Sequence, residues 1–339
     1  MSFVQCQWPS LHAQALKNLA EILPQLPNII TFTYAAQSLS PGLEFVSSMA
    51  QFSPSLTALE ISTVFLSHDA LALFATFSGL RRLLIKQLGR MTLLAASESK
   101  RSQSIQCVAN LVLGCRDTLN HLELPGEFCP LETFVSPKTS LPSLQTFILR
   151  GYPPLDSHSF PIWKVLRSMP RISKLEIFCR LRIIGAVSHR WVLMQEDAVP
   201  APGEIFLFPS QLETLTISNP SLEDFIFRRL PHSLKRLFLD FIPDWENMLS
   251  SGDSLAYHRP ARMLTLFRAM QEMAGSSGMM SLAELRIKMG WCVTPQILDF
   301  ICQIFPGLRS LELQGLRYFN RAEEPESDMV SSGESNLAN

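Results

Sequence analysis

The stretch "GLRSLELQGL", residues 307–316, carries three leucines, Leu308, Leu311 and Leu313, at the spacing L-x-x-L-x-L. The last two leucines are two residues apart, which places both side chains on one face of a β-strand. The first leucine lies just ahead of that strand. A single unit of this kind cannot bury its apolar face, so the stretch predicts a strand that needs neighbours of the same design.

The same spacing of apolar residues occurs ten times along the chain. The ten triplets are Ile29/Phe32/Tyr34, Leu56/Leu59/Ile61, Leu80/Leu83/Ile85, Leu119/Leu122/Leu124, Leu144/Phe147/Leu149, Ile172/Leu175/Ile177, Leu212/Leu215/Ile217, Leu234/Leu237/Leu239, Leu282/Leu285/Ile287 and Leu308/Leu311/Leu313. Successive triplets begin 27, 24, 39, 25, 28, 40, 22, 48 and 26 residues apart. Six of these nine intervals have the length of a leucine-rich repeat, and the three longer ones require insertions.

Helical segments and prolines fill the intervals between triplets. Apolar residues at helical spacing precede the first and the last triplet, near residues 11–22 and 297–304. Prolines stand shortly ahead of many triplets, where a helix must end: Pro27, Pro54, Pro170, Pro231 and Pro306. The sequence therefore predicts an α/β solenoid of about ten irregular leucine-rich repeats, with a parallel concave sheet and helices on the convex side.

This pattern resembles the leucine-rich-repeat family, specifically the helix-bearing repeats of ribonuclease-inhibitor-like proteins and of the receptor halves of F-box proteins. The resemblance covers roughly residues 10–318. The stretches "LPSLQTFIL" and "FPGLRSLEL" are similar to those that lead into the strands of fungal F-box-like proteins. The Asn or Cys ladder of the strict repeat is missing, so irregular loops are expected. The resemblance implies substrate recognition for a ubiquitin ligase, through a Skp-type adaptor.

An F-box would be a helical segment ahead of the repeats. Only 28 residues precede Ile29, and the segment from Leu11 to Leu23 is assigned to a repeat helix. We therefore expect no recognisable F-box in this sequence. Three explanations stay open: the chain works without an F-box, the sequence is truncated, or a very divergent F-box is hidden in it.

The predicted repeat domain spans residues 1–320, with insertions at about 178–209 and 240–279. Residues 321–339 are acidic, rich in serine and free of aromatic residues, so we expect a disordered tail. Just before it, Tyr318 and Phe319 are candidates to cover the edge of the last strand.

Three interrupting segments have their own patterns. The first insertion alternates apolar and polar residues, which predicts extra strands at one rim. The second predicts a loop followed by an amphipathic helix near residues 262–273. The polar stretch "ASESKRSQS", residues 96–104, is expected to be a mobile loop.

The composition narrows the class of protein. Charged residues make up 17% of the chain, below the usual ~25%, which favours contact with other proteins. A net charge of -1 gives no general attraction for nucleic acid or for anionic membranes. Seven scattered cysteines without a C-x-x-C pair argue against a disulfide framework and a zinc site, and no cofactor motif occurs. We expect no cofactor, no metal and a cytoplasmic or nuclear location.

The third, fifth and seventh positions of each template point away from the core, toward the concave side. The residues chosen there as a protein-binding strip are Arg82, Leu84, Lys86, Ile148, Arg150, Phe178, Arg236 and Phe238. Apolar side chains next to arginines are typical of interface hot spots. The alternative is that an insertion folds into the concavity and covers them.

Two functions are compatible with this strip, and neither is an enzyme, because no hydrolase, nucleotide-binding or metalloprotease motif occurs. The first is an F-box-like substrate receptor that binds a protein or peptide. The second is a free-standing leucine-rich-repeat scaffold unrelated to ubiquitination.

Overall fold

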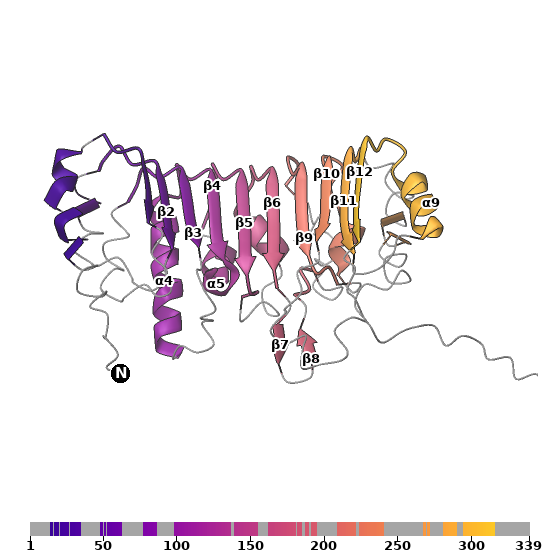
Figure 1. Ribbon diagram of the computed structural model, residues 1–339, viewed down its shortest axis with the longest axis horizontal. Helices are drawn as coiled ribbons and strands as arrows, with labels where there is room; N and C mark the ends of the chain where they lie inside the picture. The colour runs from indigo at the N-terminus through magenta and orange to yellow at the C-terminus, as the bar shows by residue number, and fades with distance from the viewer. Residues whose placement is uncertain are drawn as a thin grey trace, which may run out of the picture.

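The computed structural model of the 339-residue chain describes residues 14–34 and 48–62 with short gaps, 77–86, 98–136, 139–154, 162–180, 182–184, 187–189, 191–194, 209–221, 224–240, 267–271 without 269, 281–289 and 294–315. In this part of the chain, ten strands form one open sheet in which all neighbours are parallel. The strands stand side by side in chain order along the molecule (Figure 1). They are β1 (Thr31–Tyr34), β2 (Ala58–Ser62), β3 (Arg82–Lys86), β4 (His121–Pro125), β5 (Thr146–Gly151), β6 (Lys174–Cys179), β9 (Thr214–Ser218), β10 (Arg236–Asp240), β11 (Glu284–Met289) and β12 (Ser310–Gly315).

The register of the sheet follows the repeat. The fourth template position of every repeat falls in one row across the strands: Phe32, Leu59, Leu83, Leu122, Phe147, Leu175, Leu215, Leu237, Leu285 and Leu311. From β2 to β11 these side chains are at most 2% exposed. Burying each one contributes roughly 1.5–3 kcal/mol, and each repeat shares that gain with its neighbours. The predicted core and the predicted parallel solenoid are confirmed.

The turns before the strands explain the prolines. The N–H of Leu56 donates to the carbonyl of Ser53 at 3.1 Å, and the N–H of Leu308 donates to the carbonyl of Phe305 at 3.0 Å. Proline occupies the second position of both turns, where its fixed φ suits the turn. The same closure joins Leu26 to Ile29, Leu141 to Leu144 and Met169 to Ile172. In each of these repeats, the turn that leads from the helix or loop into the next strand therefore closes at the first template residue.

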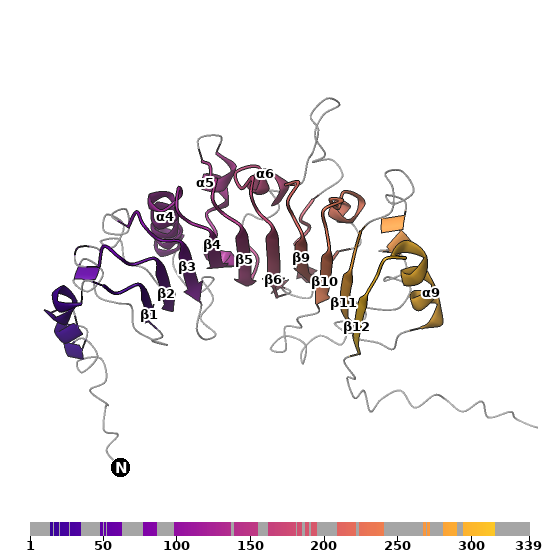
Figure 2. The same cartoon turned by 90° about the horizontal axis from the view of Figure 1, so that it is seen from above.

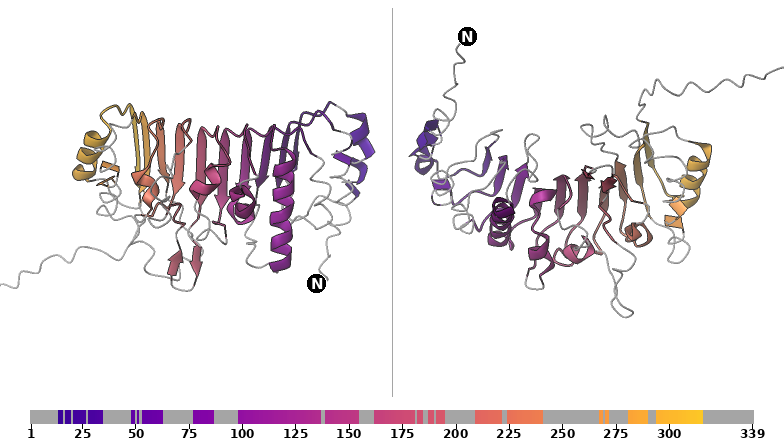
Figure 3. Two further views of the ribbon diagram at one scale, coloured as in Figure 1. Left: turned by 180° about the vertical axis from the view of Figure 1, so that it is seen from behind. Right: turned by 90° about the horizontal axis from the view of Figure 1, so that it is seen from below.

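Helices cover the outer side of the arc. The α-helices with described bounds include α4 (Glu98–Gly114), α5 (Leu131–Val135), α6 (Ile162–Leu166) and α9 (Pro295–Ile304), and the 3-10 helices include η1 (Leu23–Gln25), η3 (Gly126–Phe128) and η4 (Phe225–Arg228). Residues 14–15, 17–19 and 21–22, inside the segment predicted to be helical before the first triplet, and residues 48–49 and 51 are helical as well. Seen from above, α4, α5 and α6 lie on the convex side of the curved sheet (Figure 2). The view from behind places α4 and α5 in front of the strands, in agreement (Figure 3).

The polar stretch at 96–104 is not a loop where it is described. Residues 98–104 form the first two turns of α4, so this prediction was wrong. The reason lies further along the same helix. One face of this helix is fully buried, at 0% exposure, and its residues follow the helical spacing: Ser104, Cys107, Val108 and Leu111. Packing of this face orders the polar turns ahead of it, and α4 fills the long interval between the third and fourth triplets.

The first insertion contains the predicted extra strands. β7 (Arg182–Ile184) and β8 (Val187–His189) form an antiparallel pair that projects beyond the carboxyl ends of β6 and β9 (Figure 1). In the second insertion, residues 267–268 and 270–271 are helical, inside the predicted helix. Residues 195–208, 241–266 and 272–280 lie outside the described residues.

The two edge strands are β1 and β12. The apolar layer becomes exposed there, since Leu311 is 40% exposed although it occupies the core position of its repeat. The predicted cover of this edge, Tyr318 and Phe319, and the predicted tail at 321–339 lie outside the described residues. Within the described helices, none combines the length and the apolarity needed to span a bilayer.

Candidate functional site

Three rows of side chains line the concave face of the sheet. They alternate with the buried core positions and follow from the strand register. From β2 to β11, the first row holds Ala58, Arg82, His121, Thr146, Lys174, Thr214, Arg236 and Glu284. The central row holds Glu60, Leu84, Glu123, Ile148, Glu176, Thr216, Phe238 and Arg286, and the last row holds Ser62, Lys86, Pro125, Arg150, Phe178, Ser218, Asp240 and Lys288.

All eight residues chosen from the sequence lie in these rows, but their exposure differs. Leu84 and Ile148 are each only 4% exposed, so the expectation that they face solvent does not hold. Ile148 lies between Glu123 and Glu176 in the register, and Arg150 bridges the same two glutamates. These ion pairs enclose the side chain of Ile148. Phe178 and Phe238, which are half-buried, are then the accessible apolar residues among the eight.

Arg150 organises the centre of the concave face. Its Nε donates to Glu123 Oε1 at 2.7 Å, and its Nη2 lies 3.8 Å from Glu176 Oε2. The guanidinium carbon also lies 4.6 Å from the ring centroid of Phe178, its neighbour across β5 and β6. Lys174 completes the group with an ion pair of 2.8 Å to Glu176. We call Glu123, Arg150, Lys174, Glu176 and Phe178 the Arg150 cluster.

A second cluster repeats this plan on β10 and β11. The guanidinium carbon of Arg286 lies 4.4 Å from the centroid of Phe238, and its Nη2 lies 3.1 Å from Asp240 Oδ2. Lys288 Nζ lies 3.8 Å from the same oxygen. These four residues form the Arg286 cluster. Arg286 and Lys288 were missed by the sequence reasoning, although they occupy the fifth and seventh template positions of the ninth repeat and could have been found there.

Acidic and basic side chains are buried to different depths on this face. Glu123, Glu176 and Asp240 are 7%, 8% and 4% exposed. In contrast, the side chains of Arg150 and Lys174 are 49% and 43% exposed. The carboxylates thus form the floor of the site, and the cationic groups form its solvent-facing layer.

Two further arginines and a histidine complete the first row. Arg82 and Arg236 are exposed, and neither makes a salt bridge within the described residues. His121 is half-buried, and its pKa is lowered mainly by burial. The positive charges of Arg82 and Lys174 lower the pKa further, whereas Glu123 and Glu176 raise it in part. His121 is therefore neutral at pH 7, and positive charge on this row comes from the arginines and the lysine.

The described residues include cysteines and possible metal ligands, whose burial and grouping decide their chemistry. No group of His, Cys, Asp or Glu among them could hold a metal ion. Cys107, Cys115, Cys129 and Cys179 are buried and free, and Cys302 is exposed and free. Burial raises the pKa of Cys107 and Cys115 to about 11, so these thiols stay protonated and unreactive.

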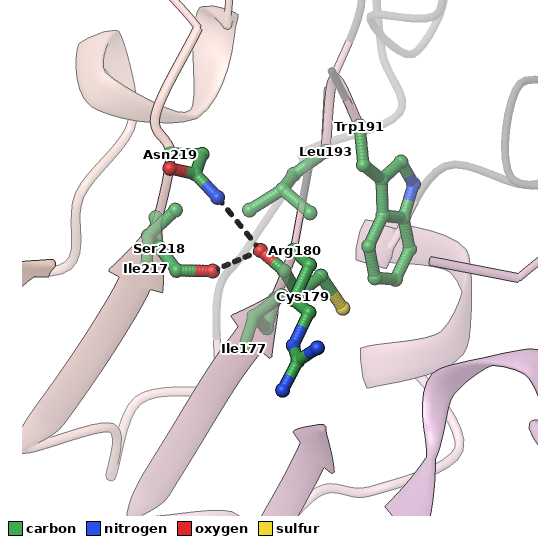
Figure 4. Close-up of a pocket in the computed structure, with 8 residues that line it drawn as sticks. All are labelled: Ile177, Cys179, Arg180, Trp191, Leu193, Ile217, Ser218 and Asn219. Carbon is green, nitrogen blue, oxygen red and sulfur yellow. Dashed lines mark hydrogen bonds between the residues drawn. The ribbon is translucent and has the colours of Figure 1, made fainter. Parts of the chain in front are cut away.

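A small pocket beyond the carboxyl ends of β6 and β9 has a structural role. Ser218 Oγ and Asn219 Nδ2 both donate to the carbonyl of Cys179, at 2.6 and 2.9 Å (Figure 4). Trp191 and Leu193 line the pocket, where the chain returns from the first insertion. These contacts tie β6 to β9 across that insertion and leave little room for a ligand.

Asp224 fixes the same return segment through its carboxylate. Its carboxylate accepts the backbone N–H groups of Leu193, Met194 and Ile226 at 2.8, 3.0 and 3.2 Å. Burial raises the pKa of Asp224 to about 7, against the three backbone donors that lower it. The residue is an anchor within the scaffold, away from the concave rows.

The chain is similar to some solved structures at low sequence identity. No protein-family model matches the chain, and no curated protein matches its sequence. Among solved structures, an internalin of Listeria monocytogenes is similar over 87% of this chain, with 13% identity and a TM-score of 0.39. A leucine-rich-repeat protein of Leptospira interrogans is similar over 89% of this chain and 71% of its own, with 12% identity and a TM-score of 0.32. The chain spans 65% of the length of the internalin.

Similarity at this level says nothing about partners or activity. The assignment of the fold rests on the chain itself, because ten template copies align in one parallel sheet with their core residues in one row, which is buried from β2 to β11. The chain is a leucine-rich-repeat solenoid whose concave face carries two arginine–phenylalanine clusters.

Proposed function

We propose that the protein is a non-catalytic interaction module that binds a protein or peptide on its concave face. The observation that carries this proposal is the pair of clusters in which a half-buried phenylalanine, Phe178 or Phe238, lies under an arginine. Aromatic and arginine side chains that are already held in place lose little conformational freedom on binding, which is why interfaces favour them.

The test is a binding selection with matched variants. Short random peptides are selected for binding to the wild-type protein, and their affinity is then measured for the double variant Phe178→Asp/Phe238→Asp. We expect at least about a tenfold loss of affinity, because both apolar contacts are replaced by charge. Far-UV circular dichroism and thermal unfolding verify that the variant is folded.

Phe225→Asp is the control. Phe225 is also half-buried and lies near two arginines, Arg228 and Arg229, at 5.4 and 5.5 Å, but it belongs to η4 and not to the concave rows. Its replacement should leave peptide affinity unchanged. Equal loss in both variants, or none in the double variant, would contradict the assignment of the concave face.

Within this proposal, the more specific role is that of an F-box-like substrate receptor for ubiquitin ligation. The support is the sequence resemblance of the proline-led repeats to fungal F-box and ribonuclease-inhibitor-like proteins. Co-purification of a Skp-type adaptor with the full-length protein is the expected result. Stable complexes that never contain such an adaptor would favour the alternative, a free-standing scaffold that binds its partner without ubiquitination.

We also propose a cytoplasmic or nuclear location. The four buried free thiols and the exposed Cys302 are compatible with a reducing compartment. Imaging of the tagged full-length protein in its native cell tests this location, and a secreted protein would contradict it.

A further inference from the structure

We infer that the segment bound on the concave face is an acidic, extended polypeptide. This inference rests on the proposed function and adds the chemistry of the partner. It follows from the way the face distributes its charges, with carboxylates in the floor and cationic groups toward solvent.

The acidic groups of the face are already occupied. Glu123 and Glu176 each hold a basic side chain at 2.7–2.8 Å, and Asp240 holds Arg286 at 3.1 Å. All three are less than a tenth exposed. A partner therefore meets little uncompensated negative charge between β3 and β10. The partly exposed carboxylates of Glu60 and Glu284 lie on the flanking strands β2 and β11.

The basic groups remain accessible. On β3 to β10 the three rows contain five lysines and arginines and three acidic residues, so this face is positive although the whole chain has a net charge of -1. The five are Arg82, Lys86, Arg150, Lys174 and Arg236. Arg82 and Arg236 are exposed and lack a salt-bridge partner in the described part of the chain, so both can pair with a carboxylate of the partner. Arg236 also lies near the carboxylate of Glu213 and next to Glu284 in the register.

Their positions set the spacing that the partner needs. Arg82 on β3 and Lys174 on β6 are three strands apart, about 14 Å at the usual strand separation. Lys174 and Arg236 on β10 are two strands apart, about 10 Å. An extended chain advances about 3.3 Å per residue, so it would place acidic residues about four and then about three positions apart. Apolar residues between them would reach Phe178 and Phe238.

A nucleic acid fits this face less well than a polypeptide. Three of the five basic side chains, Lys86, Arg150 and Lys174, are already paired with glutamates at 2.6–2.8 Å. The face of Phe178 is covered by Arg150, so it offers no open platform for a stacked base. Two unpaired arginines are a weak electrostatic track for a phosphate backbone.

The test uses the same peptide selection on the full-length protein. Peptides whose binding is lost in Phe178→Asp/Phe238→Asp should be enriched in Asp and Glu and depleted in Lys and Arg. The charge-reversed variant Arg82→Glu/Arg236→Glu should bind them about tenfold or more weakly, and added salt should weaken wild-type binding. Because these arginines are exposed and make no salt bridge among the described residues, the variant is expected to fold. Arg82→Gln/Arg236→Gln should give an intermediate loss.

The control variant Arg116→Glu/Arg229→Glu makes the same change of charge outside the concave rows and should leave affinity unchanged. Peptides that depend on the phenylalanines but carry no excess of acidic residues would overturn this inference and leave the proposed function standing. If the selected peptides bind Phe178→Asp/Phe238→Asp as tightly as the wild type, the proposed function itself is overturned. If single-stranded oligothymidylate binds more tightly than the peptides and depends on the same arginines, the acidic-polypeptide assignment is wrong.

Discussion

The guanidinium carbon of Arg286 lies 4.4 Å from the ring centroid of Phe238, its direct neighbour across β10 and β11. The same guanidinium donates to Asp240, which is only 4% exposed. Arg286 is thus held from two sides, by an aromatic face and by a buried carboxylate. Arg150 is held in the same manner by Phe178 and Glu123. The residues of the two clusters come from five strands, β4, β5, β6, β10 and β11.

Removal of Arg286 should destabilise the fold. Arg286→Ala leaves the buried carboxylate of Asp240 with Lys288, at 3.8 Å, as its remaining ion-pair partner among the described residues, and we expect a loss of about 1–3 kcal/mol in the free energy of unfolding. Urea denaturation measures it. Adding Asp240→Asn to the same chain should restore part of the loss, because the uncompensated charge is then gone. The exposed pair of Lys235 and Glu213, at 2.6 Å, is the control, since solvent screens it and Lys235→Ala should cost clearly less than Arg286→Ala.

The pH dependence of stability should contain a contribution from Asp224. Its pKa rises from 3.8 to about 7 on folding, so between these values the folded state binds more protons than the unfolded state. The contribution of this group to stability is therefore complete below the lower pKa, decreases as pH rises toward 7, and is constant above that. Urea unfolding of the wild type and Asp224→Asn across this range measures it. The free energy of unfolding of the wild type, minus that of Asp224→Asn, should decrease as pH rises from about 4 to 7. A difference that does not change with pH would contradict the shifted pKa.

The cost of truncating one template position should depend on its place in the array. Leu215→Ala, in the middle of the sheet, removes a side chain that is 0% exposed and should cost about 2–5 kcal/mol. Leu311→Ala changes the equivalent residue of the edge strand, which is 40% exposed, and should cost clearly less. Thermal unfolding of the two variants compares them. Equal costs would mean that the edge is covered in solution.

Two glycines offer a matched pair of substitutions. A Cβ on Gly126 would lie 2.2 Å from the carbonyl oxygen of Tyr152, a backbone atom that cannot move aside easily, so Gly126→Ala should destabilise the protein by about 1–3 kcal/mol. A Cβ on Gly307 meets no atom within 4 Å. Gly307→Ala should therefore be neutral or slightly stabilising, by restricting the unfolded chain. Chemical denaturation of both variants provides the comparison.

Repetition is the reason that so much of the architecture could be predicted. The triplet around Leu311 is ambiguous alone, but ten copies in one phase have a single common solution, a parallel sheet with its aliphatic residues in a row. Strand periodicity then assigns Arg82, Phe178 and Phe238 to the opposite face without any coordinates. These inferences use only local spacing, which the amino-acid order contains in full.

Packing between repeats decided the rest. Leu84 and Ile148 occupy concave positions and are nevertheless buried, because charged side chains from neighbouring strands close around them. The polar start of α4 is helical because a buried face further along the helix orders it. The meeting of Arg150 with two glutamates joins residues 27 and 26 positions away in the chain, a coupling that exists only once the strands stand in register.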